Sequence, residues 1–513
     1  MEFLQNIKLI QGGMGVYVSN WRLAKSVAME KPGVTAGTVS GTALDVVHIR
    51  LLQLGDPGGH LRRALAAFDE KFGVEIGRTI LEKYFIEGGK APAERFRYGP
   101  KQTVHTQDGN TTFPMQSGLS APIYLALDEE LIELLIATSF AEVWLAKEGH
   151  AGNIFINFLN KVEIPLIFAM YGAMLAGVDG IVVGAGNPDG LPAVCTQLAQ
   201  HATVAHELSV LYRESGESFI LPFDPRLIAA GKLARTPLKR PAFLAIVSLE
   251  NLVNALVQSP SQAPDGFIIE HHTAGGHNAA PQGPMKKDEL GQPIYSELDE
   301  PDLIAIRQTE KPFWLAGGYG SQARLQLALN AGAVGVQTGS IFAMAEESGI
   351  SPTHRIAIFN ELKKGTPDSA LVQTSLYSPT GFPFKVAQLN NTLADDEVYE
   401  ARRRLCDLGF LQQRGLTKAD ENGSRRMFQR CSAAPIQDFV SKRGLPFNTD
   451  GKRCLCNGLL SGVGLGQMGT QSGDHAEEPA IVTLGNNLDG IRRLSRQGQA
   501  QYWAKNVVED ILG

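Results

Sequence analysis

The sequence has little cysteine, no excess of positive charge and no uninterrupted apolar run that would suggest a membrane span. Five cysteines in 513 residues are too few for a disulfide scaffold. With 47 Lys and Arg against 53 Asp and Glu, the formal net charge is −6, whereas nucleic-acid-binding domains usually present a strongly basic face. We therefore expect neither a disulfide-rich secreted protein nor a nucleic-acid partner.

Targeting and membrane segments are not expected either. Residues 1–5 lack the basic region and long apolar run of a secretory signal. The most apolar window, residues 165–186, approaches the ~20 residues that cross a bilayer. It contains Asp179 and ends in glycines, which favours a buried helix followed by a strand. We expect a cytoplasmic protein without membrane contact.

Glycine, in contrast, is abundant: the chain has 55, where average usage of ~7% would give about 36. Short apolar runs end in Gly, Asn or Ser, and stretches of helical spacing separate them. The candidate strands are residues 8–11, 33–38, 153–158, 180–183, 219–222, 241–247, 266–269, 313–315 and 334–337. This alternation predicts right-handed crossovers, a parallel sheet and a (β/α)8 TIM barrel.

The nine candidates are one more than the eight strands of a barrel. We therefore expect residues 219–222 to form either a strand or an edge piece that precedes residues 241–247. An open doubly wound sheet is the alternative, but no early Gly-x-Gly-x-x-Gly turn supports it.

Two stretches do not fit the repeat and set the predicted domain boundaries. Residues 42–147 look mainly helical and are far longer than an ordinary connection, so we expect an insertion or lid after the second strand. Residues 349–513 are expected to form a mainly helical C-terminal extension. The barrel itself is assigned to residues 1–41 and 148–348.

The last two candidate strands end in glycine-containing turns. A phosphate commonly binds at this place in a barrel, where backbone N–H groups and a following helix N-terminus stabilise the anion. The candidate phosphate residues are Ala316, Gly317, Gly318, Gly339 and Ser340. For either run taken alone, the alternative interpretation is a tight strand-to-helix turn.

A second candidate group follows the strand at residues 266–269. Gly275 and Gly276 allow the backbone to pack against a flat ring, and His277 could then project over that ring. An imidazole near its ordinary pKa can accept a proton at neutral pH. We expect His271 and His272 to be core or supporting groups. No metal is expected, because no carboxylate or cysteine stands at a recognisable ligand spacing.

Three further strand ends supply candidates. Gly12, Gly13 and Met14 close the first strand, and Met14 could pack on an apolar ring or merely fill a gap. Asn157 is a polar residue near a strand end, suited to hydrogen-bonding a ring edge. Gly184 ends the strand at residues 180–183.

Taken together and in order, these motifs resemble nitronate monooxygenases, formerly called 2-nitropropane dioxygenases, and the related flavin-type enoyl-acyl carrier protein reductases. The resemblance covers residues 7–348 and rests on residues 11–15, 171–179, 274–281, 316–318 and 339–340 and on the Asn157 strand. It is specific for the superfamily and not for one reaction.

The resemblance implies FMN across the barrel mouth. Gly317, Gly318, Gly339 and Ser340 would hold the phosphate, and His277 matches the catalytic histidine. The residues expected to line the isoalloxazine are Gly12, Met14, Asn157, Gly275 and Gly276, and we add Gly13, Gly184 and Ala316 as neighbours. Thr273 stands where the family often has an acidic residue. The resemblance therefore indicates the flavin more specifically than it indicates the substrate.

The first functional hypothesis is oxidation of a small alkyl nitronate by O2 to a carbonyl compound and nitrite, with His277 as base or orienting group. The alternative is an enoyl-thioester reductase that takes hydride from NAD(P)H. In that case Arg50, Arg62, Arg63 and Lys71 of the insertion could accept an acyl carrier protein, although such charges are more often a solvated helix face. A homodimer is compatible with both hypotheses. A non-enzymatic scaffold is disfavoured by His277 beside the glycine pair.

Four of the cysteines lie in the predicted extension. Cys406, Cys431, Cys454 and Cys456 could in principle supply four thiolates for zinc or an iron–sulfur cluster. The Cys-x-Cys pair is spaced more closely than the usual structural zinc motifs. The preferred interpretation is buried free thiols.

Overall fold

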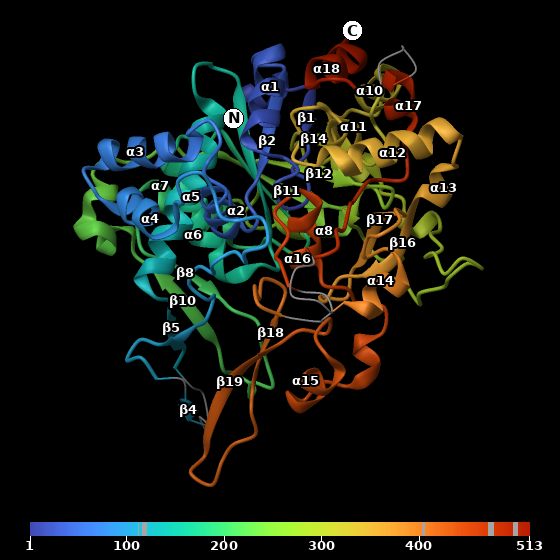
Figure 1. Ribbon diagram of the computed structural model, residues 1–513. Coiled ribbons are helices and arrows are strands. Elements are labelled where there is room, and N and C mark those ends of the chain that lie inside the picture. The colour runs from blue at the N-terminus through green and yellow to red at the C-terminus, as the bar shows by residue number, and fades with distance from the viewer. Residues whose placement is uncertain (111, 115–120, 403–405, 470–476, 496–500) are drawn as a thin grey trace.

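Eight parallel strands close into a barrel in the computed structural model, which describes residues 1–110, 112–114, 121–402, 406–469, 477–495 and 501–513 (Figure 1). The first and last strands pair with each other, which confirms the (β/α)8 prediction. The barrel strands are β1 (Leu9–Gln11), β2 (Thr35–Ser40), β6 (Asn153–Leu159), β7 (Gly180–Gly184), β11 (Ala242–Val247), β12 (Gly266–Glu270), β14 (Phe313–Ala316) and β15 (Gly335–Thr338).

Apolar side chains fill the barrel interior, and the N-terminal segment closes the end of the barrel opposite the carboxyl ends of the strands. The inner cluster includes Ile10, Phe155 and Trp314. The short 3-10 helix η1 (Glu2–Asn6) packs Leu4 beneath them, and the Trp314 indole N–H donates to the Ile7 carbonyl at 2.8 Å. With this end blocked, the mouth at the carboxyl ends of the strands is where a ligand can enter.

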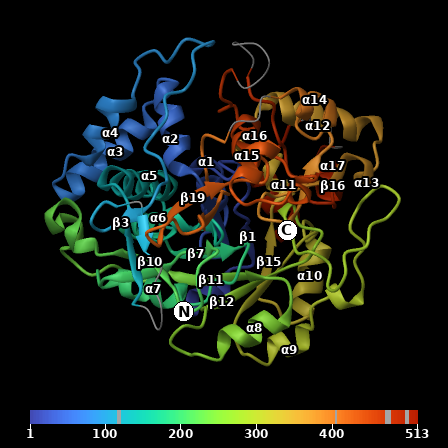
Figure 2. The same cartoon turned by 90° about the horizontal axis from the view of Figure 1, so that it is seen from below.

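A ring of helices covers the outside of the barrel, and Figure 2 shows several of them outside the strands. It consists of α1 (Trp21–Glu30), α5 (Glu129–Lys147), α6 (Glu163–Leu175), α7 (Leu191–Ala199), α8 (Glu250–Val257), α9 (Leu303–Arg307), α10 (Gln322–Asn330) and α18 (Ala504–Leu512).

Two of these helices lie outside the residues assigned to the barrel from sequence. Helix α18, at the C-terminus, packs between α1 and α10 and completes the ring after β15. Helix α5 belongs to the predicted insertion but packs against α1 and α6 as the helix that precedes β6. Each barrel helix packs between two neighbouring helices. Two of these places in the ring are filled by α5 and α18, which come from segments that the sequence analysis did not assign to the barrel.

The insertion combines helices and short strands. Its elements before α5 are α2 (Leu44–Gln53), α3 (His60–Phe72), α4 (Ile76–Tyr84), β3 (His105–Thr106), β4 (Thr112–Pro114) and β5 (Ile123–Ala126). The candidate strand at residues 219–222 is β10 (Phe219–Phe223), and it lies outside the barrel between β5 and β8 (Val204–Glu207). The connection between β7 and β11 also contains β9 (Val210–Leu211) and η2 (Pro225–Ala234).

The C-terminal extension contains two hairpins in addition to its helices. Its strands are β16 (Val372–Tyr377), β17 (Pro383–Ala387), β18 (Gln413–Leu416) and β19 (Ser424–Arg430). Its other helices are α12 (Pro352–Lys364), α13 (Asp368–Leu371), α14 (Asp396–Ala401), α15 (Ile436–Ser441), η4 (Pro446–Thr449), α16 (Leu455–Gly462) and α17 (Asp489–Ser495), and the short helix α11 (Ser340–Ala343) precedes the extension directly after β15. The prediction of a mainly helical extension does not anticipate the hairpins, whose strands are short and pair within the extension as well as with β13, β9 and β4.

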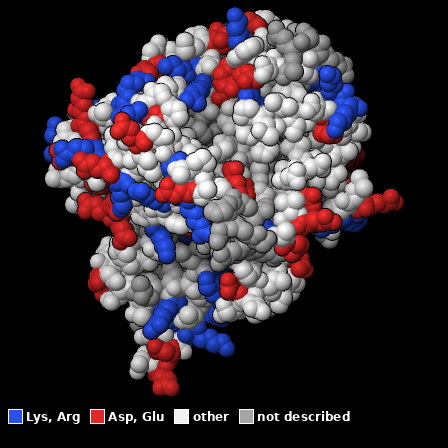
Figure 3. Space-filling view, viewed as in Figure 1, with Lys and Arg blue, Asp and Glu red and all other residues white. Residues whose placement is uncertain are grey.

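The outlying strands join distant segments. Strand β19 pairs with β4 of the insertion, and β18 pairs with β9, so one sheet contains three separate excursions from the barrel. In Figure 1 this sheet projects on the side opposite α18. Charged side chains of both signs are interspersed over most of the face in Figure 3. Among the helices of the described residues, none combines the length and the apolarity that a bilayer crossing requires.

Candidate functional site

A single cavity opens at the mouth of the barrel and contains about 1650 Å³ of space, part of it open to solvent. All the site residues predicted from sequence line it. They are Gly12, Gly13, Met14, Asn157, Gly184, Gly275, Gly276, His277, Ala316, Gly317, Gly318, Gly339 and Ser340. The carboxyl ends of the barrel strands bring these positions together although they are spread over most of the chain.

Buried hydrogen bonds fix the loop after β1. The Ser19 hydroxyl donates to the Gly12 carbonyl at 2.9 Å and accepts the Met14 backbone N–H at 2.9 Å. The Gln11 side-chain amide donates to the same hydroxyl at 2.8 Å. Ser19 was not predicted from sequence, because nothing near it in the chain signals that it bonds back to this loop.

Close backbone packing explains one glycine of this loop. A Cβ atom at Gly13 would lie 2.2 Å from the Cβ atom of Asn157, so only glycine allows the loop to pass this strand. Met14 packs toward the last strand, with its sulfur 3.3 Å from the position of a Cβ atom at Gly339. The loop therefore has one conformation over the strand ends.

The glycine turns after β14 and β15 form another wall. Gly317 has a φ of +92°, and a Cβ atom there would lie 2.9 Å from Thr273 Oγ1. Helix α11 begins at Ser340, where the first backbone N–H groups have no acceptor within the helix. The turns thus present backbone amides to the cavity where a phosphate was predicted.

A loop of the C-terminal extension closes this wall. Leu484, Gly485 and Asn487 line the cavity, and a Cβ atom at Gly275 would lie 2.7 Å from the Leu484 carbonyl carbon. The Gly485 backbone N–H donates to Ser340 Oγ at 2.7 Å. Sequence reasoning missed this loop, because it lies outside the barrel repeat and carries no motif.

His277 lies on a short strand, β13 (Gly276–His277), that pairs with β17. Its ring meets Phe384 edge to face, with centroids 4.9 Å apart, and its Nε2 atom is buried without a hydrogen-bond partner among the described residues. Burial, and then the charge of Lys161, hold the pKa of His277 well below its usual value. The expectation of an ordinary pKa is therefore wrong, because the ring is desolvated beside a cation.

Lys161 follows β6 and lies over the ring of Phe382, with its nitrogen 3.7 Å from the ring centroid. Its ammonium also donates to Thr380 Oγ1 at 3.3 Å. Burial lowers the pKa of Lys161 to about 7. A buried cation and a neutral imidazole thus lie close together beside the cavity.

A carboxyl group and an amine lie below the glycine pair. Glu270, at the end of β12, lines the cavity, and burial raises its pKa to about 7 against the opposing charge of Lys385. Lys385 of β17 is buried, which lowers its pKa to about 8, and it donates to the His272 carbonyl at 2.5 Å. Glu270 precedes the predicted histidine motif, but its partner Lys385 lies more than a hundred residues further along the chain.

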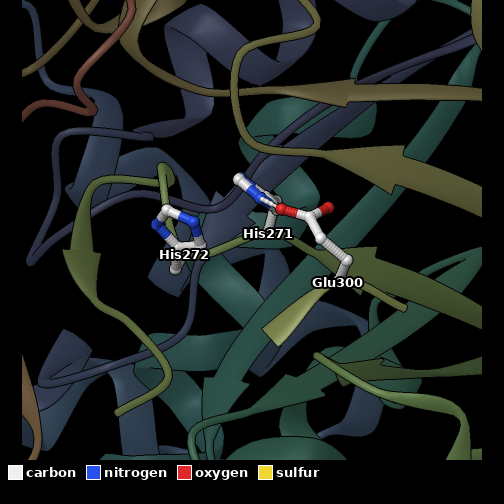
Figure 4. Close-up of side chains that lie close together, drawn as sticks. All are labelled: His271, His272 and Glu300. Carbon is white, nitrogen blue, oxygen red and sulfur yellow. Dashed lines mark hydrogen bonds and ion pairs between the residues drawn. The ribbon is translucent and has the colours of Figure 1, made fainter. Parts of the chain in front are cut away.

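His271, His272 and Glu300 form a cluster beside the cavity (Figure 4), with three donor atoms that all lie within 4.8 Å of one another. His271 contacts Glu300 Oε1 through Nε2 at 2.9 Å and Thr273 Oγ1 through Nδ1 at 2.8 Å. The ring of His272 stacks on Tyr295 with centroids 3.7 Å apart. These contacts position Thr273, which lines the cavity.

Three polar atoms in the cavity wall have no protein partner. Gln337 Oε1, Thr338 Oγ1 and His277 Nε2 are buried, and no described residue bonds to them. Buried polar atoms are nearly always paired in folded proteins. The three atoms, together with the glycine-lined backbone, fit a ligand with a polar flat ring.

Part of the cavity lining is apolar. Leu159 and Val162 contribute to it from the barrel, and further side chains come from the extension. The extension residues are Phe410, Leu411, Leu455, Cys456 and Leu459. We call these seven residues the apolar arm.

The cationic residues proposed for carrier-protein docking make hydrogen bonds or ion pairs within the chain. Arg50 is 2% exposed and donates to the Leu465 carbonyl, so it cannot meet a partner protein. Lys71 donates to the Leu175 carbonyl at 2.8 Å, Arg62 pairs with Asp56, and Arg63 pairs with Glu148. The part of that expectation that included Arg50 is wrong, because the helix turns this side chain into the core.

No known family model matches the chain, and no curated protein sequence matches it. Solved structures do resemble it. FabK from Thermotoga maritima is 13% identical with a TM-score of 0.44, and the match covers 100% of this chain and 93% of that one. A nitroalkane oxidase from Streptomyces ansochromogenes is 12% identical with a TM-score of 0.43, covering 99% and 94%.

The enoyl reductase domain of MlnA, from the macrolactin biosynthesis cluster of Bacillus amyloliquefaciens, is 11% identical with a TM-score of 0.41, covering 98% and 92%. The solved structures that resemble the chain thus include both kinds of enzyme named from the sequence motifs. The barrel assignment itself rests on the strand pairing of this chain.

Proposed function

We propose that the protein is an FMN-dependent oxidoreductase. One observation carries the proposal: the predicted residues line a single cavity that also contains three unpartnered polar atoms, on Gln337, Thr338 and His277. A flavin has both a phosphate for the glycine turns and a polar ring edge for Gln337 and Thr338, which leaves His277 for a substrate. When bound, it would supply transfer of a hydride or of single electrons.

The glycine turns would hold the phosphate. Gly317 and Gly318 after β14, and Gly339 and Ser340 after β15, present backbone amides along one wall. The loop after β1 and the Gly275–Gly276 pair, which border the same cavity, would line the ring. Because both sets are fixed by packing, the cofactor site is formed before the ligand enters.

The apolar arm favours reduction of an enoyl thioester over oxidation of a small nitronate. Its side chains extend the cavity beyond the glycine-lined part, which suits an acyl chain. In this reaction NAD(P)H would supply a hydride for the β carbon of the double bond, and a proton would be added at the α carbon. Neutral His277 would orient the thioester through Nε2, the atom left without a partner.

A second candidate function, nitronate oxidation, is favoured by the buried cations. Burial lowers the pKa of Lys161 to about 7 and that of Lys385 to about 8, and the two amines lie near His277 and Glu270 respectively, so an anionic substrate in the cavity would favour their protonated forms. A nitronate carries its negative charge before the reaction, whereas an enoyl thioester develops charge only during it. Release of nitrite from propionate nitronate in the presence of O2 would favour this second function.

The experiment that tests the main proposal has two steps. A visible spectrum of the purified protein, before and after incubation with FMN, shows whether flavin binds. An anaerobic sample is then mixed with NADPH to bleach the flavin and with an enoyl thioester to restore its colour. A protein that stays colourless with excess FMN contradicts the flavin proposal. A flavin that NADPH does not bleach contradicts only the reductase.

A further inference from the structure

Four cysteines from distant parts of the extension converge on a second, small cavity. Cys406, Cys431, Cys454 and Cys456 all line it. Cys406 precedes β18, Cys431 directly follows β19, and the other two flank the first residue of α16. The fifth cysteine, Cys195, is buried in α7. Only the fold, and not proximity in sequence, brings these three places together.

A backbone N–H group lies near each of the four sulfur atoms. These groups are those of Gly409 near Cys406, Ala433 near Cys431, Asn457 near Cys454 and Leu411 near Cys456. The Gln412 side-chain amide also donates to Cys406 Sγ at 3.2 Å. Amide donors aimed at sulfur are the interactions that stabilise metal-bound thiolates and tune iron–sulfur clusters.

A buried cation with spare donors lies nearby. Arg402 is 3% exposed, its Nε pairs with Glu478, and its charge interacts with Cys454. Its two Nη atoms are buried and bond to no residue that the structure describes. Unsatisfied guanidinium donors in the interior are costly, so their presence beside Cys454 favours an anionic group at this place.

The spread of the sulfur atoms distinguishes the metal. A tetrahedral zinc with Zn–S bonds of about 2.3 Å places its sulfur ligands about 3.8 Å apart. Among the described residues, a 4.8 Å limit on all donor-atom distances gathers His271, His272 and Glu300 but no three of the four thiols. Cys406 and Cys431 are close enough to hydrogen-bond to each other, so the wider spacing concerns the set of four and not every pair. A four-iron cluster accepts such a set more readily than one zinc ion, because each thiolate binds a different iron.

We propose that Cys406, Cys431, Cys454 and Cys456 bind a [4Fe–4S] cluster. Leu411, Leu455 and Cys456 line both this cavity and the one at the barrel mouth, so the two sites share a wall. The four cysteines are free thiols, as expected from sequence, although Cys406 is exposed, and the proposal assigns a ligand to these thiols. The cluster site does not depend on the proposed flavin chemistry.

The test measures iron, acid-labile sulfide and zinc in the full-length chain, produced with added iron and purified without oxygen. We expect about four iron and four sulfide per chain and an electron paramagnetic resonance signal of a reduced cluster after dithionite treatment. Chemical analysis of iron and sulfide does not depend on flavin, so the result is readable whether or not FMN is bound. Less than one iron per chain after anaerobic reconstitution, or stoichiometric zinc, would overturn the proposal.

Matched alanine variants locate the cluster. Cys406→Ala and Cys431→Ala should each lose more than half of the iron, whereas Cys195→Ala should keep the iron content of the unmodified protein. Retention of all iron by both Cys406→Ala and Cys431→Ala would contradict the assignment. A disulfide between any two of the four cysteines, found by mass spectrometry after anaerobic alkylation, would contradict it as well. If Cys431→Ala fails to fold, Cys406→Ala still tests the assignment, because Cys406 is exposed and its substitution should leave the fold intact.

Discussion

Gly485 donates its backbone N–H to the Ser340 hydroxyl at 2.7 Å, and this bond joins the C-terminal extension to the turn after the last barrel strand. The contact is tight: a Cβ atom at Gly485 would lie 2.8 Å from the Thr273 carbonyl oxygen and 3.2 Å from the Gly275 nitrogen. The extension therefore completes the proposed phosphate wall. It is part of the site and not an appendage to a finished barrel.

Gly485→Ala should weaken FMN binding because the added methyl group has no room between Thr273 and Gly275. We expect the dissociation constant to rise about tenfold, which corresponds to about 1.4 kcal/mol. Fluorescence titration of the apoprotein with FMN measures it. Gly464→Ala serves as the control for FMN binding: that glycine also lies in the extension, a Cβ atom there meets nothing within 4 Å, and its φ of +76° means that the substitution costs stability without crowding the site. Equal affinities for both variants would contradict the proposed role of this loop.

Ser19→Ala should destabilise the protein and loosen the loop after β1. The substitution leaves the Met14 N–H without its acceptor, which costs about 1–3 kcal/mol, whereas the Gly12 carbonyl keeps the Gln11 side-chain amide as a donor. Urea unfolding gives the change in free energy, and the same sample should bind FMN more weakly.

Ser139→Ala is the matched control for Ser19→Ala. Ser139 is also fully buried, but its hydroxyl has no partner among the described residues. Its removal should therefore change the free energy of unfolding by less than about 1 kcal/mol. Similar losses in the two variants would mean that the Ser19 network does not hold the loop.

The sequence predicts the barrel and the cavity well because both depend on local features. Gly13 and Gly317 follow apolar strands directly, and parallel strands place such positions at one rim. Lys385 and Gly485 were missed because their contacts at the site are with residues far away in the chain, and Ser19 was missed because no local pattern shows that the chain folds back to the loop after β1. The same reason hides the role of α18, whose place beside α1 is decided by packing and not by its own pattern.

Leu459→Ala tests whether the apolar arm binds an acyl chain. Removing this half-buried side chain should lower kcat/KM about tenfold for an enoyl thioester with a long chain, since each buried methylene contributes about 0.8 kcal/mol. A four-carbon thioester, which does not reach the arm, should lose less than twofold. Leu445→Ala, at an exposed position of the extension, is the control. An equal loss for the short and the long substrate would argue against this placement.

The low pKa of His277 makes the stability of the fold depend on pH. Burial and the charge of Lys161 disfavour the protonated ring, so the pKa of His277 is lower in the folded chain than in the unfolded chain, where it has its ordinary value of about 6.5. The stability that comes from keeping this ring neutral is complete above that pH. It is lost as the pH falls below it, by at most about 1.4 kcal/mol per pH unit.

His277→Gln removes this titration while keeping a polar side chain. At pH 7.5 the variant should be less stable than the unmodified protein, because Phe384 loses its edge-to-face partner. Between pH 6.5 and 5 the difference should shrink or reverse, because only the unmodified protein loses stability through His277. Urea unfolding at several pH values measures the difference in the free energy of unfolding. A difference that stays constant from pH 7.5 to 5 would mean that the ring takes up its proton as easily in the fold as in the unfolded chain. His277 would then be charged at moderately acid pH, and the neutral imidazole assigned to the proposed site would be wrong.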